Sequence, residues 1–125
     1  MIPQRRAVKE ELLADRRRWG SAAMECEGRA FRRHKVHLCQ GGLELNEVLF
    51  PRNVFQRLKT SEQVYFWHRL NCSVMCDWSH DTFGHTPEYR AWFLDRMIWI
   101  YGFEEVRMWV ENAPLKIKQT KGGVF

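Results

Sequence analysis

Two short stretches of this sequence hold side chains suited to metal-assisted hydrolysis. The first, residues 43–52, places a polar pair, Asn46 and Glu47, inside an otherwise apolar strand-like segment. The second contains Asn71 and, nine residues later, His80 just inside an expected helix. Carboxylates and imidazoles bind divalent metals, and both can move a proton near neutral pH. Together these groups could supply a base and a site for a divalent metal, which metal-assisted hydrolysis needs.

The composition is that of one small folded domain. The chain has 125 residues, of which 45% are hydrophobic, and its six Trp and eight Phe supply bulky side chains for a core. No apolar run approaches the roughly 20 residues that a membrane-spanning helix needs. The N-terminus is charged, so no secretion signal is expected. We therefore expect a cytoplasmic protein whose four cysteines are thiols or metal ligands.

Basic residues are concentrated in the N-terminal part of the chain. Residues 1–36 contain ten Lys/Arg and five Asp/Glu, which accounts for the whole net charge of +5, and the remaining residues balance at ten against ten. A basic segment beside a neutral body is typical of proteins that bind nucleic-acid phosphates. A solvated helix with ordinary arginines is the alternative explanation of the same charge.

Hydrophobic periodicity predicts helices at both ends of the chain. A basic helix is expected over residues 4–18. Thr86 is a good N-cap and Pro87 suits the first helical position, so a second helix should begin there and run to Gly102. A final helix is expected over residues 103–113. Three tryptophans of these last helices, which have apolar neighbours, are expected in the core: Trp92, Trp99 and Trp109.

Between the terminal helices the pattern predicts short strands, and hence an α+β fold. Residues 36–38 and 43–48 suggest two strands joined by a glycine turn. Residues 59–70 are expected to form a connecting loop with aromatic anchors. A further short strand is expected at residues 74–75, followed by a short helix over residues 77–83.

The strand pair and the helix histidine together resemble the HNH endonuclease family, whose strand–loop–helix unit holds one divalent metal against a DNA phosphate. Asn71 matches the family's loop asparagine and His80 its first helix histidine. Asn46 and Glu47 lie at the strand pair, which in many members reads His-Glu. The resemblance covers about residues 36–85, and the C-terminal extension is also similar to the tails of small phage-encoded members.

This resemblance implies a ββα-metal, treble-clef-like core between a basic N-terminal helix and two C-terminal helices. A single HNH-like domain would then fill the chain. Its parts would be a basic extension at 1–34, the ββα-metal core at 35–85, a helical extension at 86–114 and a tail at 115–125.

The resemblance also implies a site and a reaction. Catalytic roles would fall to Asn46, Glu47, Asn71 and His80, and the metal ligands would be Asn46, Glu47, His80 and His85. His85 is included among the metal ligands because the family's second helix ligand would fall on Gly84, the residue just before it. The cofactor would be Mg²⁺, Mn²⁺, Ni²⁺ or Zn²⁺, and the reaction would be nicking or double-strand cleavage of double-stranded DNA in a phage or bacterial setting.

Asn46 leaves the activity of the chain open, because an amide nitrogen cannot accept a proton from water. In one interpretation Glu47 is the base and Asn46 replaces a metal ligand. In a second, the chain is a non-catalytic DNA-binding module derived from the HNH fold. In a third, Asn46 is a substitution that silences an active enzyme. A treble-clef-like protein-interaction domain is a further alternative.

The resemblance also raises a second metal site, because many members of the family carry a structural zinc held by two Cys-x2-Cys pairs. Only part of such a set is present here, namely His37, Cys39 and Cys76, with Cys72, Cys26 or water as a fourth ligand. Buried free thiols are the alternative.

Phosphate contacts are expected from basic side chains at the core and in the N-terminal helix. Arg52 follows the strand pair directly, whereas the N-terminal arginines would add sequence-independent, salt-sensitive affinity. The full set is Arg5, Arg6, Arg16, Arg17, Arg18, Arg52, Arg57, Lys59 and Arg69. Whether the protein acts as a monomer or a dimer, and in homing, genome packaging or recombination, stays open.

Overall fold

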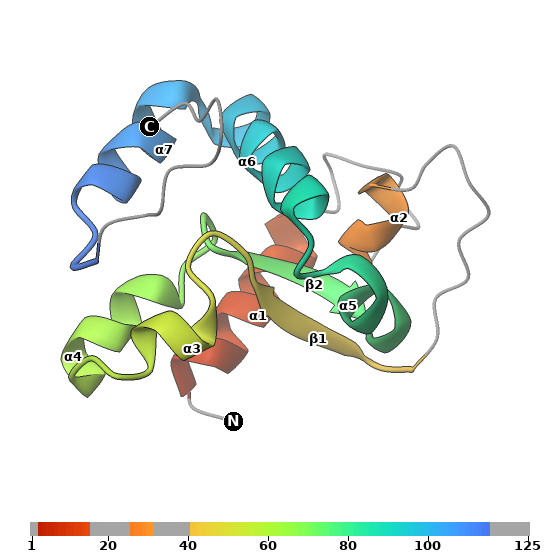
Figure 1. Ribbon diagram of the computed structural model, residues 1–125, viewed down its shortest axis with the longest axis horizontal. Helices are drawn as coiled ribbons and strands as arrows, with labels where there is room; N and C mark the ends of the chain where they lie inside the picture. The colour runs from red at the N-terminus through yellow and green to blue at the C-terminus, as the bar shows by residue number, and fades with distance from the viewer. Residues whose placement is uncertain (1–2, 16–25, 32–40, 116–125) are drawn as a thin grey trace.

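A two-stranded antiparallel sheet lies at the centre of the computed structural model, with helices packed around it (Figure 1). The structure describes residues 3–15, 26–31 and 41–115. The predicted α+β class is confirmed. In chain order the elements are α1 Pro3–Asp15, α2 Glu27–Phe31, β1 Leu43–Glu47, α3 Arg52–Phe55, α4 Thr60–Gln63, a 3₁₀ helix Val64–Phe66, β2 Cys72–Cys76, α5 Asp77–Phe83, α6 Pro87–Tyr101 and α7 Phe103–Glu111.

Strands β1 and β2 pair along their whole length, and β2 runs directly into α5. Leu45 lies opposite Val74 in this register, and every residue of β2 is buried. Cys76 caps α5, since its sulfur accepts a hydrogen bond from the Ser79 N–H. The predicted helix over residues 77–83 is confirmed. The predicted strand at 36–38 lies outside the described residues.

The connection from β1 to β2 is more ordered than expected. The prediction of a loop over residues 59–70 is wrong, because α4 and the 3₁₀ helix occupy its first part. Gln63 Nε2 donates to the carbonyl oxygens of Gln56, at 3.1 Å, and Leu58, at 2.8 Å. Phe66 and Trp67 then enter the core. Local hydrogen bonds and two buried rings therefore stabilise a segment that lacks a regular apolar period.

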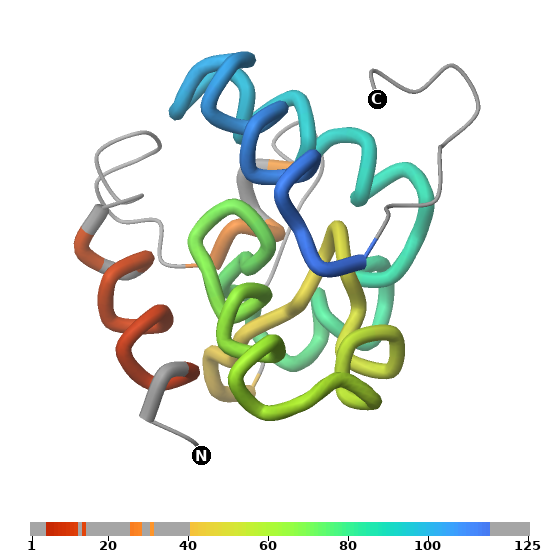
Figure 2. The backbone as a smooth tube through the Cα atoms, turned by 90° about the vertical axis from the view of Figure 1, so that its left-hand side faces the viewer, coloured from red at the N-terminus to blue at the C-terminus, as the bar shows by residue number. Residues whose placement is uncertain are grey.

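Helix α1 docks on the sheet through its apolar face. Val8 and Leu12 are buried, and Lys9 Nζ donates to the Leu43 carbonyl oxygen at 2.6 Å. The structure describes the predicted N-terminal helix as far as Asp15. Arg16–Arg18 lie outside the described residues. Figure 2 shows α1 beside the sheet, with α6 and α7 crossing another side of the molecule.

Helices α6 and α7 form a hairpin that closes the core. As predicted, Thr86 caps α6 by accepting from the Tyr89 N–H at 3.2 Å, with Pro87 at the first position. Gly102 joins the helices at φ +96°, a conformation that side chains disfavour. Trp109 is buried, but the prediction of a core position for Trp99 is wrong, since Trp99 is 64% exposed.

Candidate metal and phosphate site

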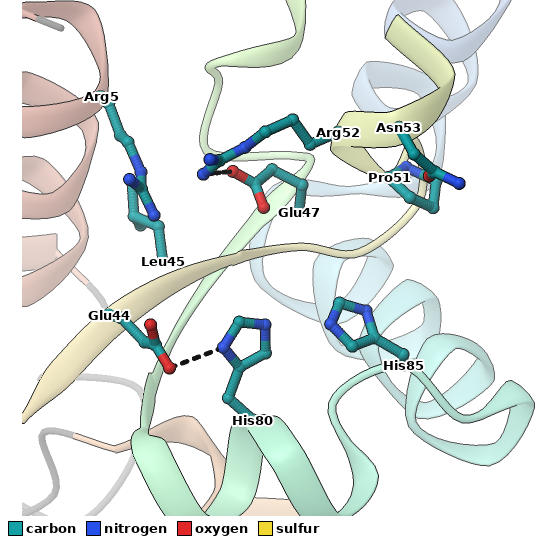
Figure 3. A pocket seen from close by; sticks show the side chains of 9 residues that line it. All are labelled: Arg5, Glu44, Leu45, Glu47, Pro51, Arg52, Asn53, His80 and His85. Atoms are coloured by element: carbon teal, nitrogen blue, oxygen red, sulfur yellow. Dashed lines mark hydrogen bonds and ion pairs between the residues drawn. The ribbon is translucent and has the colours of Figure 1, made fainter. Parts of the chain in front are cut away.

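An open pocket of about 630 Å³ lies along β1, where α1, α3 and the region of α5 meet the strand (Figure 3). Its lining is polar and charged apart from two positions. The lining residues are Arg5, Glu44, Leu45, Glu47, Pro51, Arg52, Asn53, His80 and His85.

The first group in this pocket joins β1 to α5. His80 Nδ1 lies 2.7 Å from Glu44 Oε1. Asp81 completes a set in which one ligand atom from each residue lies within 4.8 Å of the others. Two carboxylates and an imidazole form a donor set that divalent cations accept, so this group could hold a metal ion.

Glu44 and Asp81 were not among the residues expected from the sequence. Glu44 lies opposite Met75 in the sheet, and His80 follows five residues after Met75, in the first turns of α5. The strand register therefore brings Glu44 to the imidazole. The sequence did contain a signal for Glu44, because this carboxylate lies two positions before Asn46. Residues i and i+2 share a strand face, so Glu44 could have been expected on the face of Asn46.

The second group in the pocket is an ion pair between Glu47 and Arg52. Arg52 Nη2 donates to Glu47 Oε1 at 2.9 Å, and the side chains are 45% and 6% exposed respectively. The Arg52 guanidinium also lies over the Trp67 ring, 5.2 Å from its centroid. Figure 3 shows this pair on one side of β1 and the Glu44–His80 contact on the other. Both groups line the same pocket, which therefore contains a guanidinium as well as two of the candidate metal ligands.

His85 follows α5 and faces the same pocket, with its ring centroid 4.8 Å from that of His80. Partial desolvation lowers the pKa of His85, and nearby His80 lowers it further, against the opposing effect of Glu47 and the other carboxylates. The neutral imidazole is therefore favoured at neutral pH. In that form it can accept a proton or bind a metal.

Asn46 lies behind the pocket and is not among its lining residues. Its side chain is fully buried, and Nδ2 donates to the Gly84 carbonyl oxygen at 2.7 Å. Its Oδ1 is buried and has no hydrogen-bond partner among the described residues. The amide ties β1 to the end of α5, immediately before His85, so it positions the residues that follow that helix.

Asn71 has a similar bracing position at the same end of the sheet, directly before β2. Its Oδ1 accepts from the Phe50 N–H at 2.7 Å. Its Nδ2 donates to the Phe50 carbonyl oxygen at 3.0 Å and to the Phe66 carbonyl oxygen at 3.1 Å. The buried amide thus fixes the turn between β1 and α3, just before Arg52.

The expected zinc ligands are divided between described and undescribed parts of the chain. Cys76 is buried, and its sulfur lies 3.1 Å from Ser79 Oγ. Cys26 accepts from the Cys76 N–H at 3.2 Å, and Cys72 is also buried, with its sulfur 3.8 Å from the Phe66 carbonyl oxygen. His37 and Cys39 lie outside the described residues, so a structural zinc stays a prediction.

Of the expected phosphate contacts, Arg5 and Arg52 reach the pocket and others do not. Arg6 is exposed on α1 but does not line the pocket. Arg69 pairs with Glu105 on α7, away from the pocket lining. Arg57 and Lys59 are exposed near α3 and α4.

Comparison with known proteins gives no relative: no protein-family model, curated protein or solved structure matches the chain. Within the described residues, no helix is both long and apolar enough to span a membrane. The chemistry of the pocket is therefore the basis for proposing a function.

Proposed function

We propose that this protein is a metal-dependent DNA endonuclease of the HNH type, which hydrolyses phosphodiester bonds of double-stranded DNA. The observation that carries the proposal is the 2.7 Å contact between His80 and Glu44 in a pocket that also contains Arg52. The order β1, β2, α5 supports a ββα-metal core, since it is the strand–strand–helix order of that family. Carboxylates, imidazoles and a guanidinium in one open pocket suit phosphoryl chemistry.

Glu44, His80 and Asp81 would hold the divalent metal, since their ligand atoms lie within 4.8 Å of one another. When bound, the metal supplies a Lewis acid for the developing charge on the phosphate and leaving oxygens. Mg²⁺, Mn²⁺, Ni²⁺ and Zn²⁺ all accept such ligands, with Mg²⁺ favouring the carboxylates and Zn²⁺ the imidazole.

We assign the proton-accepting role to His85, because desolvation and nearby His80 lower its pKa and leave it neutral at neutral pH. Glu47 holds Arg52 by their 2.9 Å ion pair, and Arg52 in turn would bind a non-bridging phosphate oxygen. The alternative is that Glu47 is the base, and mutagenesis must distinguish Glu47 from His85 in this role. In this arrangement the reaction does not require an ionisable side chain at Asn46.

Plasmid cleavage in the presence of each of the four metals tests the proposal. The native protein should nick or cut DNA, His80→Ala should abolish cleavage, and Thr82→Ala, an exposed neighbour on the same helix, should leave it unchanged. Loss in His85→Ala with retention in Glu47→Gln would support His85 as the base, and the opposite result would assign that role to Glu47. Absence of cleavage with every metal would refute the endonuclease.

A non-catalytic DNA-binding module is the second candidate, and the position of Asn46 favours it. The strand position that supplies a histidine in many HNH members here holds a buried amide bonded to the Gly84 carbonyl. Salt-sensitive DNA binding by the native protein, with no cleavage by either the native chain or Asn46→His, is the result expected of that module.

A further inference from the structure

We infer that Arg5, on α1, is a second phosphate-binding residue of the pocket, so that the protein engages two consecutive phosphates of one nucleic-acid strand. The inference rests on the proposed function, because it concerns the substrate of the same site. Arg52 would bind one phosphate and Arg5 its neighbour along the chain.

Helix α1 holds Arg5 in a fixed place relative to the pocket. Val8 and Leu12 are buried against the core, and Lys9, one turn after Arg5, donates to the Leu43 carbonyl oxygen at 2.6 Å. Residues four apart lie on the same helix face, so this contact also directs Arg5 toward β1. Arg5 therefore belongs to an anchored surface of the pocket, although it lies far from the strand–helix motif in sequence.

The two arginines converge on one aromatic ring. The guanidinium carbon of Arg5 lies 5.7 Å from the Trp67 centroid, and that of Arg52 lies 5.2 Å from the same centroid. Figure 3 shows both side chains extending toward the same side of β1. Trp67 is only 7% exposed, so its ring is a fixed platform for both cations. Two guanidinium groups that contact one ring and line the same solvent-accessible pocket favour a ligand with more than one negative charge.

The two arginines differ in their partners, and this difference favours a ligand for Arg5. Glu47 neutralises Arg52 through the 2.9 Å ion pair. Within the ranges that the structure describes, no carboxylate pairs with Arg5, and its buried Nε has no hydrogen-bond acceptor. Arg5 is partly exposed and lines the open pocket, so its terminal N–H groups can donate to an anionic phosphate oxygen without competition from a carboxylate.

The test measures binding without catalysis, by NMR titration of the protein in a chelating buffer. The probes are the dinucleotide d(TpT), which has one phosphodiester, and the trinucleotide d(TpTpT), which has two. A trinucleotide with one neutral methylphosphonate linkage is the charge control. For the native protein we expect the trinucleotide to bind about tenfold more tightly than either probe with a single charge.

In Arg5→Gln, which keeps much of the aliphatic stem, the preference for the trinucleotide should fall to the roughly twofold statistical advantage of a second phosphate. Arg6→Gln is the matched control, because Arg6 is exposed on the same helix but does not line the pocket. It should keep the full preference. Arg5→Lys should restore part of it, because the charge returns without the planar donor set.

Three results would overturn the inference: equal weakening of all three probes by Arg5→Gln, an equal effect of Arg6→Gln, or no trinucleotide preference in the native protein. Equal weakening would mean that Arg5 only supports Trp67. Circular dichroism of each variant separates unfolding from loss of a contact. Since no cleavage is measured, a protein that never cuts DNA but shows the trinucleotide preference would refute the endonuclease and retain the two-phosphate site.

Discussion

His80 Nδ1 and Glu44 Oε1 lie 2.7 Å apart, although the two residues are 36 positions apart in the sequence. The antiparallel register of β1 and β2 creates this contact, because β2 leads directly into α5 and returns the helix to the start of β1. The contact makes the pair the centre of the candidate metal site.

Removing His80 should abolish specific metal binding. We expect His80→Ala to weaken Mn²⁺ binding, measured by calorimetry, by more than about 100-fold, since a direct ligand matters at least as much as the outer-shell partners whose loss costs about 10–100-fold. Glu44→Gln should weaken it by at least about tenfold on the same basis. Glu88→Gln, an exposed carboxylate change on α6, is the control. Unchanged affinity in His80→Ala would rule out this metal site.

His85 should titrate below its ordinary value in the metal-free protein. Partial desolvation and His80 both lower its pKa, so NMR of the imidazole signals should give a pKa under about 6.5. In His80→Ala that pKa should move up, because one of the two causes is removed. A pKa above 6.5 in the metal-free native protein would contradict the expected environment.

The same shift has a consequence for stability. A histidine whose folded pKa is lower than its unfolded pKa binds more protons when unfolded. The contribution of His85 to the free energy of unfolding is therefore fully present above its unfolded pKa, and it is lost as pH falls through its folded pKa. Denaturation of the metal-free protein at pH 7 and below should show a smaller pH dependence in His85→Asn than in the native chain.

Asn71→Ala should be strongly destabilising. The substitution leaves three buried backbone groups, the N–H and C=O of Phe50 and the C=O of Phe66, without this partner. Buried groups that lose their partners cost about 1–3 kcal/mol each, and such losses are not fully additive, so we expect about 2–5 kcal/mol in urea denaturation. The exposed Asn112 supplies the control, Asn112→Ala, which should change stability by less than about 0.5 kcal/mol. Equal effects of the two variants would show that the turn does not depend on Asn71.

Asn46→His should destabilise the protein and should not increase cleavage. The Asn46 side chain is fully buried, and its Nδ2 lies 2.7 Å from the Gly84 carbonyl oxygen and 3.3 Å from Met75 Sδ. A larger imidazole would crowd this space, and overpacking costs about 1–3 kcal/mol. Thermal unfolding and plasmid cleavage of the variant provide the two measurements. A large gain in cleavage would instead support the interpretation that Asn46 silences an active enzyme.

The sequence by itself determined the elements whose signals are local. Val8 and Leu12 recur at helical spacing and are buried on α1. Thr86 and Pro87 predicted the start of α6, since capping needs only neighbouring residues. The helix at residues 77–83 followed from the same kind of information.

Only the tertiary structure decided which polar residues meet. Glu44 and Asn46 alternate with Leu43 and Leu45 in β1, but Glu47 breaks this alternation, so the sequence did not determine which of the three polar residues faces solvent. The packing of α5 against β1 buries Asn46 beside Gly84 and leaves Glu44 facing His80. The docking of α1, with Lys9 bound to a strand residue 34 positions away, brings Arg5 to the pocket. These relationships depend on contacts between distant segments, which periodicity and capping signals cannot specify.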